Sequence, residues 1–400
     1  MVSTRIVTIL YFADTRFPIE RANGVQTMAT CHALAQAGHD VHLIVRPDTA
    51  PTPRDPVVFY GLAPVAGLRV TPLATSGSGW IRRVTFLARA WRVARRHRNA
   101  VVFTRDLGFA ALLVQLPRAR RPRLIYESHG IAPIVAAEMP ALLGNPSLSP
   151  SPAKLRRLDR RERIVWQRAG AYVTITRALA DDLIARYGSR DDVFVVPDGA
   201  APLQPAATDP YEPHGVPIAA YAGHLYPWKG VDVFVRALAQ APHVRGLIVG
   251  GHPGESDRAR VEALAREVGV EDRLEITGLV EPAKVVSHLA RASILVLPNI
   301  ASSISERYTS PLKLFEYLWC GRAIVASDLP AIREVLTTDE TALLVAAGDP
   351  SALALALERL VAAPELARRL GAAARQLAPA FTWTRRAQRL EPALAAAIRS

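Results

Sequence analysis

The chain of 400 residues is half hydrophobic, which predicts two domains with separate cores rather than one. Its formal net charge is +13 at pH 7, and the whole excess lies in the first half of the chain, so this half is expected to meet an anionic surface. No stretch of about 18 uncharged apolar residues occurs, which excludes a membrane-spanning helix. The N-terminus lacks a signal-peptide pattern, and the two cysteines, Cys31 and Cys320, fit neither a disulfide framework nor a metal set, so we expect a cytoplasmic protein without a metal.

Strands and helices alternate from the start of the chain. A buried strand is predicted at 5–13, a helix at 25–37 and a second strand at 41–45, with Asn23-Gly24 in the loop before the helix. Further strands are predicted at 68–73, 100–104, 124–127, 171–176 and 193–196, with helices at about 80–98, 107–116, 154–169 and 178–187. Such alternation is typical of a parallel sheet covered by helices on both faces.

A proline-rich stretch then interrupts the pattern. Residues 197–217 contain six prolines, which predicts a linker at 199–216 between domains at 1–198 and 217–382. Beyond it, strands are predicted at 218–222, 246–249, 274–277, 294–297 and 323–326, with helices at 231–240, 257–268, 282–291 and near 351–362. The sequence therefore predicts two doubly wound α/β domains that face each other across a cleft, with ligands bound at the carboxyl ends of the strands.

The segment 305–327 has the most specific pattern in the second half. Ser310 is predicted as the N-cap of a helix with Pro311 at its first position, and Gly321 ends this helix. The predicted buried stripe consists of Leu312, Phe315, Leu318 and Trp319, and the opposite face carries Lys313, Glu316, Tyr317 and Cys320. A helix tip with free N–H groups and a cation attracts phosphate, and a carboxylate one turn later can accept hydrogen bonds from a sugar, so the arrangement suits a nucleotide sugar.

Shorter motifs follow other predicted strands. Tyr221 to Gly230 comes after the first strand of the second half and contains Gly223, His224 and Lys229. Gly250-Gly251 begins a glycine-rich turn through Gly254, and Gly278-Leu279 follows a later strand. In the first half, Glu127 and His129 lie where a strand ends. Each motif taken alone also fits an ordinary turn or a structural histidine.

Together these segments resemble family 4 glycosyltransferases, which are retaining enzymes of the GT-B fold, and the resemblance covers nearly the whole chain. Glu316 falls on the second glutamate of the family's E-x7-E motif, in a Ser-Pro-Leu-Lys-x-x-Glu variant. The first glutamate position holds Tyr308, and Glu306 lies two residues earlier, so it stays open which of them contacts the donor sugar. The resemblance also implies that the last segment, 383–400, returns as a helix to the first, acceptor-side domain.

The resemblance assigns roles to particular residues. Lys229 matches a lysine that contacts the donor diphosphate, His224 stands where the family has an arginine, and His129 matches a histidine near the donor sugar. The implied catalytic residues are His129, Lys229 and Glu316. The implied donor-binding residues are Asn23, Gly24, Gly223, His224, Gly250, Gly251, Gly278, Leu279, Tyr308, Thr309, Ser310, Pro311, Leu312, Lys313 and Glu316.

The implied reaction is transfer of a hexose from a nucleoside-diphosphate sugar to a hydroxyl acceptor, such as a glycolipid, a lipid-linked or a polysaccharide precursor of the cell envelope. It proceeds with retention of configuration and without a metal or other cofactor. Two alternatives stay open: a nucleotide-sugar 2-epimerase of the same fold, and a catalytically silent relative that binds nucleotide sugars. A glycosidase is disfavoured because no carboxylate pair is identifiable. A dinucleotide oxidoreductase is disfavoured because no Gly-x-Gly-x-x-Gly follows a strand.

The segment 80–98 is predicted to be a basic amphipathic helix. Ile81, Val84, Leu87, Trp91 and Ala94 share one face, and Arg82, Arg89, Arg92 and Arg96 share the other. This pattern fits peripheral binding to an anionic membrane at the inner face of the plasma membrane, and it fits a solvated helix equally well. Nucleic acid is not an expected partner, since no aromatic residues alternate with these arginines.

Overall fold

A computed structural model describes residues 6–202, 215–252 and 256–400, and the chain divides into two compact units. The first unit comprises Met1–Ala136, Pro150–Asp198 and Trp383–Ser400, and the second comprises Ala137–Ser149 and Gly199–Thr382. Of the predicted linker at 199–216, residues 203–214 lie outside the described part of the chain, as does Gly254 of the glycine-rich turn.

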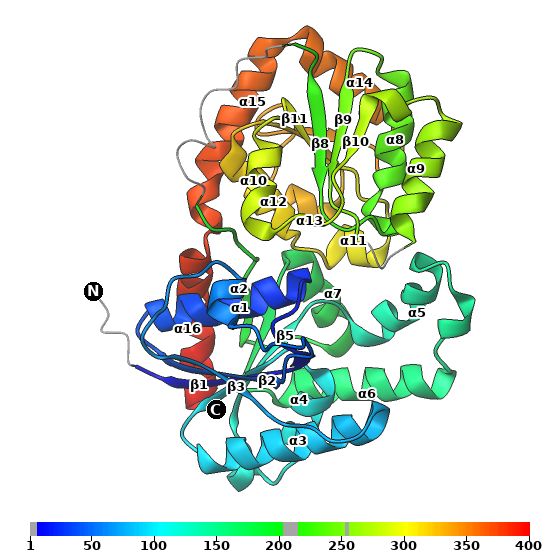
Figure 1. Ribbon diagram of the computed structural model, residues 1–400. Helices are drawn as coiled ribbons and strands as arrows, with labels where there is room; N and C mark the ends of the chain where they lie inside the picture. Colours follow the sequence, from blue (N-terminus) through cyan, green and yellow to red (C-terminus); the bar gives the residue numbers. More distant parts are fainter. Residues whose placement is uncertain (1–5, 203–214, 253–255) are drawn as a thin grey trace. The chain divides into compact units, whose positions relative to one another are not determined.

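The first unit is built on a seven-stranded parallel sheet with the strand order β3-β2-β1-β4-β5-β6-β7 (Figure 1). Its strands are β1 Thr8–Arg16, β2 Asp40–Arg46, β3 Leu68–Pro72, β4 Val101–Thr104, β5 Arg123–Ser128, β6 Ala171–Thr174 and β7 Val193–Val195. Its helices are α1 Ala22–Gln36, α2 Pro56–Phe59, α3 Gly79–Arg96, α4 Leu107–Val114, the first part of α5 Ala132–Leu142, α6 Pro152–Arg168, α7 Arg177–Tyr187 and α16 Trp383–Arg399. The strand order reverses between β1 and β4, which is where ligands bind in doubly wound sheets.

Helix α16, from the end of the chain, packs inside this first unit against α1 and against strands β5, β6 and β7. Its buried side chains include Leu390, Ala393 and Leu394, which join the same core as Met28 and Leu34 of α1. The last helix is therefore an integral layer of the first sheet's core.

The second unit is built on a six-stranded parallel sheet with the order β10-β9-β8-β11-β12-β13. Its strands are β8 Ile218–Ala222, β9 Arg245–Val249, β10 Leu274–Ile276, β11 Ile294–Leu297, β12 Ala323–Ser327 and β13 Leu343–Val345. Its helices are α8 Val231–Gln240, α9 Asp257–Glu267, α10 Pro282–Leu289, α11 Ser303–Arg307, α12 Leu312–Cys320, α13 Pro330–Arg333, α14 Pro350–Ala362 and α15 Pro364–Leu377.

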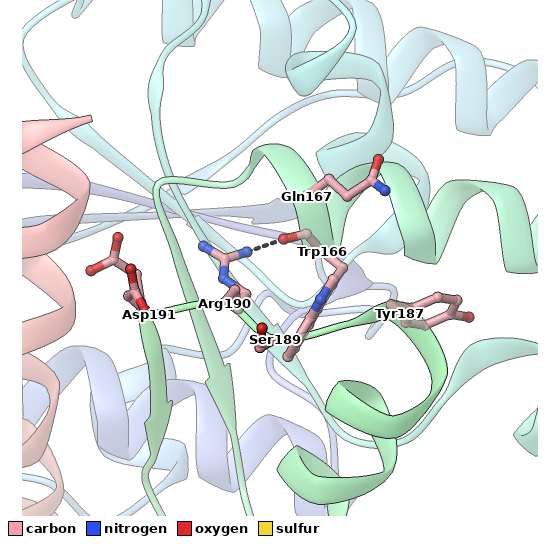
Figure 2. A pocket seen from close by; sticks show the side chains of 7 residues that line it. Trp166, Gln167, Tyr187, Ser189, Arg190 and Asp191 are labelled. Carbon is pink, nitrogen blue, oxygen red and sulfur yellow. Dashed lines mark hydrogen bonds between the residues drawn. The ribbon is translucent and has the colours of Figure 1, made fainter.

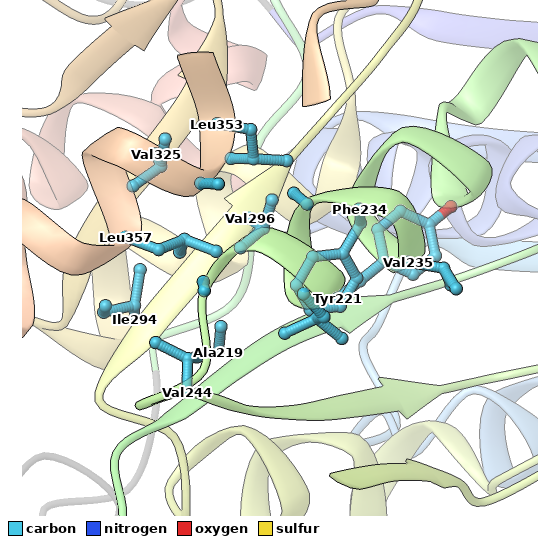
Figure 3. Close-up of a cluster of buried hydrophobic side chains, with 14 of the residues drawn as sticks. Ala219, Tyr221, Phe234, Val235, Val244, Ile294, Val296, Val325, Leu353 and Leu357 are labelled. Carbon is cyan, nitrogen blue, oxygen red and sulfur yellow. The ribbon is translucent and has the colours of Figure 1, made fainter. Parts of the chain in front are cut away.

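Two apolar cores lie on the two faces of this second sheet. One contains Phe234 of α8 and Leu357 of α14 and is shown in Figure 3. The other contains Leu314 and Phe315 of α12 and Leu289 of α10. Alternate residues of each strand point to opposite faces of the sheet, and a core covers each face. A strand such as β11 is therefore buried along its whole length. The prediction of two doubly wound α/β domains is confirmed.

Three of the predicted helices differ from the structure in detail, and the first is α12. Helix α12 has Pro311 at the N-cap position, one residue after Ser310, and its buried residues include Tyr317 and Cys320, which were predicted on the opposite face. Predicted stripe residues Leu312 and Trp319 are only half-buried. The reason is that α12 packs against the sheet, where Tyr317 accepts a hydrogen bond from the backbone N–H of Ala222, and also against α15, so its buried face is wider than a single stripe.

The other two differences lie in the first unit. Helix α1 begins at Ala22, so Asn23 and Gly24 belong to its first turn and not to a loop. Helix α3 buries Phe86, Ala90 and Ala94, which leaves Ile81 and Val84 exposed although they belong to the predicted apolar face.

Candidate functional site

The first turn of α12 places an ammonium group at the carboxyl edge of the second sheet. The Nζ atom of Lys313 lies 3.7 Å from the ring centroid of Tyr221, whose strand β8 ends one residue later. This nitrogen is buried and has no hydrogen-bond partner among the described residues. No side chain caps α12 either. A buried cation that rests on an aromatic ring and lacks a hydrogen-bond partner in the described residues, next to an uncapped helix start, attracts an anion.

Gly223 makes this position of Lys313 possible. It follows β8 with a φ of +129°, and a Cβ atom there would lie 3.1 Å from Lys313 Nζ. A side chain at residue 223 would therefore crowd the ammonium group, and the backbone angle disfavours any residue other than glycine. Gly223 and Lys313, both predicted to bind the donor, lie side by side.

Lys229 supplies a second cation to the same edge. It ends a short 3-10 turn after β8, and Gly230 follows in the left-handed conformation, where a Cβ would overlap the carbonyl oxygen of Pro298. Burial lowers the pKa of Lys229, and burial together with the charge of Lys229 lowers the pKa of Lys313 well below its usual range. The two ammonium groups thus interact with each other.

Glu316 lies one turn after Lys313 on α12. Burial raises the pKa of its carboxyl group, and the charge of Lys313 opposes that shift. The edge of the second sheet therefore combines two lysines and one carboxylate, and burial shifts the pKa of all three toward the uncharged form. The structure thus places Gly223 against Lys313 at this edge, with Lys229 in the turn after β8 and Glu316 one turn further along α12.

The predicted glycine turns form another part of this edge, and an arginine that the sequence reasoning missed joins them. A Cβ atom at Gly278 would lie 3.0 Å from Arg258 Nη1, and one at Gly251 would lie 3.8 Å from Arg258 Cβ. A Cβ atom at Gly250 would overlap the carbonyl oxygen of Gly223. The neighbouring Leu279 is 54% exposed. Arg258 donates to Glu262 over 2.7 Å, an ordinary i,i+4 helix pair that gave no sequence signal of a site.

The remaining predicted donor residues differ in their accessibility. Tyr308 is 4% exposed and buried at the end of α11, whereas Glu306, Thr309 and Ser310 are half-buried. His224 stacks on Tyr226, with ring centroids 4.9 Å apart, and Tyr226 stacks on Trp228 at 4.6 Å. The loop before Lys229 is thus stiffened by three rings.

His129 lies just after the carboxyl end of β5 in the first unit. Its Nε2 atom is 2.5 Å from Oε1 of Glu127, and burial, followed by the charge of Arg105, lowers the pKa of the imidazole. Glu127 is fully buried and also pairs with Arg386 of α16, whose Nη2 donates to Oε2 over 2.6 Å. Arg386 had no sequence signal, because a lone arginine in an amphipathic helix is usually exposed.

The two residues predicted near the first helix have different surroundings. Asn23 is exposed on the first turn of α1. Gly24 is buried, and a Cβ atom there would overlap the carbonyl oxygen of Ile19 and the hydroxyl of Tyr60. Close packing of the chain therefore explains this glycine without a ligand.

Comparison with known proteins assigns the family. Residues 23–199 match the glycosyl transferase 4-like domain, and residues 216–363 match the glycosyl transferases group 1 domain, so the two matches take in most of the chain. The chain belongs to the group 1 glycosyltransferases. The predicted resemblance to family 4 is confirmed.

The relatives of this glycosyltransferase chain agree with that assignment. D-inositol 3-phosphate glycosyltransferase from Xylanimonas cellulosilytica is 33% identical over 53% of this chain and 54% of its own length. The chain thus aligns with about half the length of that curated relative. Among solved structures, sucrose-phosphate synthase from Thermosynechococcus elongatus is 21% identical with a TM-score of 0.75, covering 96% of this chain and 97% of that one. Anabaena Alr3699/HepE in complex with UDP-glucose is 16% identical with a TM-score of 0.72, covering 97% and 99%. The predicted GT-B fold is confirmed.

One pocket of this glycosyltransferase chain lies away from all predicted residues. It has a volume of about 360 Å³ and is lined by residues 166–167, 187 and 189–192, at the amino ends of β6 and β7. Figure 2 shows Arg190 donating to the carbonyl oxygen of Trp166, and it also donates to Ala169 over 2.8 Å. Arg190 is thus used to cap the end of α6, at the strand end opposite to that of His129. Separately, no helix in the described part of the chain is long and apolar enough to span a membrane.

Proposed function

We propose that this chain is a retaining hexosyltransferase that moves a hexose from a nucleoside-diphosphate sugar to a hydroxyl acceptor. The observation that carries the proposal is the buried Lys313 ammonium, which has no hydrogen-bond partner among the described residues and lies against Tyr221 and Gly223. An unpaired buried cation is costly for the folded protein, and a bound anion removes that cost. The solved structure of Anabaena Alr3699/HepE has the same fold and is a complex with UDP-glucose. This supports a nucleotide sugar as the source of the anion.

The chemistry of this proposal follows from where charge develops. When the glycosidic bond of the donor breaks, the departing diphosphate gains negative charge. Lys229 and Lys313 would then bind the transition state more strongly than the ground state. Removing one such fixed donor typically costs about 2.7–4 kcal/mol of transition-state stabilisation. Glu316 would accept hydrogen bonds from donor hydroxyl groups.

A retaining outcome does not require a dedicated catalytic base. In the front-face mechanism expected of this family, the departing phosphate helps to deprotonate the acceptor hydroxyl. Neither Lys229 nor Lys313 would then act as a base. Both would hold the phosphate in place, and no metal is required in this scheme.

Nucleotide binding tests the proposal first. The wild type is tested against a panel of nucleoside diphosphates and the corresponding nucleotide sugars. We expect one nucleoside diphosphate, together with the sugars it carries, to raise the melting temperature. Lys229→Ala and Lys313→Ala should each weaken that ligand at least tenfold. Lys284→Ala is the matched control, because Lys284 is exposed and forms an i,i+3 ion pair with Glu281 on the helix surface. The proposal would be wrong if no nucleotide stabilised the protein, or if both site variants bound as tightly as the control.

Product analysis separates the alternatives. The proposal predicts transfer to an added hydroxyl acceptor, with the donor's anomeric configuration retained in the product by NMR. Donor conversion without an acceptor would instead identify the 2-epimerase, and tight binding without any turnover would identify the silent relative. Lys313→Ala should lower turnover at least tenfold.

We further propose that the acceptor is presented at an anionic membrane surface, reached through α3. Trp80 is 75% exposed, and Ile81 and Val84 are exposed beside it. The same helix carries exposed Arg89 and Arg92. Exposed apolar side chains can insert among lipid headgroups, while each basic residue near an anionic bilayer adds about 1 kcal/mol.

Liposome flotation tests this membrane contact. The chain should float with vesicles that contain phosphatidylglycerol and stay behind with pure phosphatidylcholine. Trp80→Ser should weaken the association, whereas Leu355→Ser, at another exposed apolar position, should leave it unchanged. Equal binding to both kinds of vesicle, or to neither, would contradict the proposal.

A further inference from the structure

We propose that Glu127 is a positioning residue that holds His129 as the Nε2–H tautomer, so that Nδ1 of His129 accepts a hydrogen bond from a substrate hydroxyl. The inference rests on the proposed glycosyl transfer and adds to it a role for a buried carboxylate and for the last helix of the chain. The side chain of His129 is 23% exposed, so part of it reaches solvent while Nε2 faces Glu127.

The donors around Glu127 decide the direction of its hydrogen bond with His129. Arg386 Nη2 donates to Oε2 over 2.6 Å, and Gln26 Nε2 donates to Oε1 over 2.8 Å. Arg105 approaches Oε1 at 4.0 Å. These donors favour an ionised carboxylate, which can only accept hydrogen bonds. The ring nitrogen 2.5 Å away must therefore carry a proton and donate it.

A neutral imidazole with a proton on Nε2 has its lone pair on Nδ1. Among the described residues, no hydrogen bond to Nδ1 of His129 is present. The other charged groups that act on this ring are Arg105, after β4, and Asp198, after β7. The geometry thus leaves one acceptor atom for a ligand, and a sugar hydroxyl is the matching donor.

Arg386 fixes the carboxylate from the opposite side. It is fully buried, and its guanidinium also donates to Thr30 over 3.0 Å and to the carbonyl oxygen of Val196 over 2.7 Å. Contacts on α1, β5 and the segment after β7 thus hold one planar group in place. The carboxylate has little freedom to rotate away from His129, as expected of a group that orients another.

Nitrogen-15 NMR of the histidine rings in the full chain tests the tautomer without any substrate, with His129→Gln to assign the signal. We expect wild-type His129 as the Nε2–H form. In Glu127→Gln the amide nitrogen can donate to Nε2, which should shift the ring toward the Nδ1–H form. Glu391→Gln is the matched control, since Glu391 forms a similar pair with His39 in the same unit, 2.8 Å apart. An Nδ1–H wild type, or a tautomer unchanged by Glu127→Gln, would overturn the proposal.

Turnover distinguishes positioning from mere stabilisation. Glu127→Gln and His129→Gln should each lower kcat at least tenfold, and the double variant should lose little more than either alone, because one residue acts through the other. Additive losses would reduce Glu127 to a structural residue and overturn the proposal. The tautomer result stands by itself if the chain turns out not to transfer sugars, so the two proposals fail separately.

Discussion

Charged groups at the carboxyl edges of the two sheets have opposite hydrogen-bonding surroundings. In the first unit, Glu127, His129 and Arg386 satisfy one another through direct hydrogen bonds. In the second unit, the Nζ atom of Lys313 is buried without a hydrogen-bond partner in the described part of the chain, and the charges of Lys229 and Glu316 act on it. The folds are alike, so the difference lies in these side chains and not in the architecture.

This difference indicates separate tasks. A satisfied buried network is rigid and gains little from a ligand, so it suits the orientation of a neighbouring group. Cations without a hydrogen-bond partner in the protein can form strong interactions with an anion once it binds. We infer that the carboxyl edge of the first sheet orients a neighbouring group, whereas the carboxyl edge of the second sheet binds an anion. Each prediction below tests one of these two roles.

The largest expected effect is on the satisfied edge. Arg386→Met should lower the free energy of unfolding by about 3–5 kcal/mol, because it leaves Glu127 buried without its cation. Urea denaturation of the full chain measures this. Arg385→Ala, at the exposed neighbouring position, should change stability by at most about 0.5 kcal/mol. A loss of unfolding free energy below about 1 kcal/mol for Arg386→Met would show that Glu127 does not depend on Arg386 as its buried cation.

The sequence predicted the fold and the unsatisfied edge better than the satisfied one. Strands bounded by glycine turns are local patterns, and Lys229, Lys313 and Glu316 each belong to a short motif next to such a strand. Arg386 lies 259 positions from Glu127, and only the tertiary fold brings them together. The wrong face predicted for α12 has the same origin. Tyr317 accepts a hydrogen bond from the backbone N–H of Ala222 on β8, and α15 packs against α12 as well, and no local pattern records either contact.

The second prediction concerns the glycine that leaves room for the unpaired cation. Gly223→Ala should cost about 1–3 kcal/mol of stability because its φ of +129° is strained for alanine. It should also weaken nucleotide binding by displacing Lys313. Gly269→Ala is a control for backbone strain alone: it also has a positive φ, but its Cβ would meet open space. If the two variants bound nucleotide equally well, contact between residue 223 and Lys313 would play no part in binding.

The smallest expected effect has the opposite sign to the first. Lys313→Met should raise the stability of the ligand-free chain by about 1 kcal/mol, since it removes an unpaired buried cation. The same variant should lose nucleotide binding.

The pH dependence follows from the lowered pKa of Lys313. Between this lowered value and the unfolded value of about 10.4, the unfolded chain binds the proton more tightly than the folded chain. Wild-type stability should therefore gain, relative to Lys313→Met, as pH rises through this window toward about 10. The gain arises because the unfolded chain still holds a proton in this window that the folded chain has released, so raising the pH disfavours unfolding. Chemical denaturation of both proteins at a series of pH values measures the difference. If the difference in unfolding free energy between the two proteins stayed constant with pH, Lys313 would be solvated or paired. The two sheet edges would then not differ in how they treat buried charge.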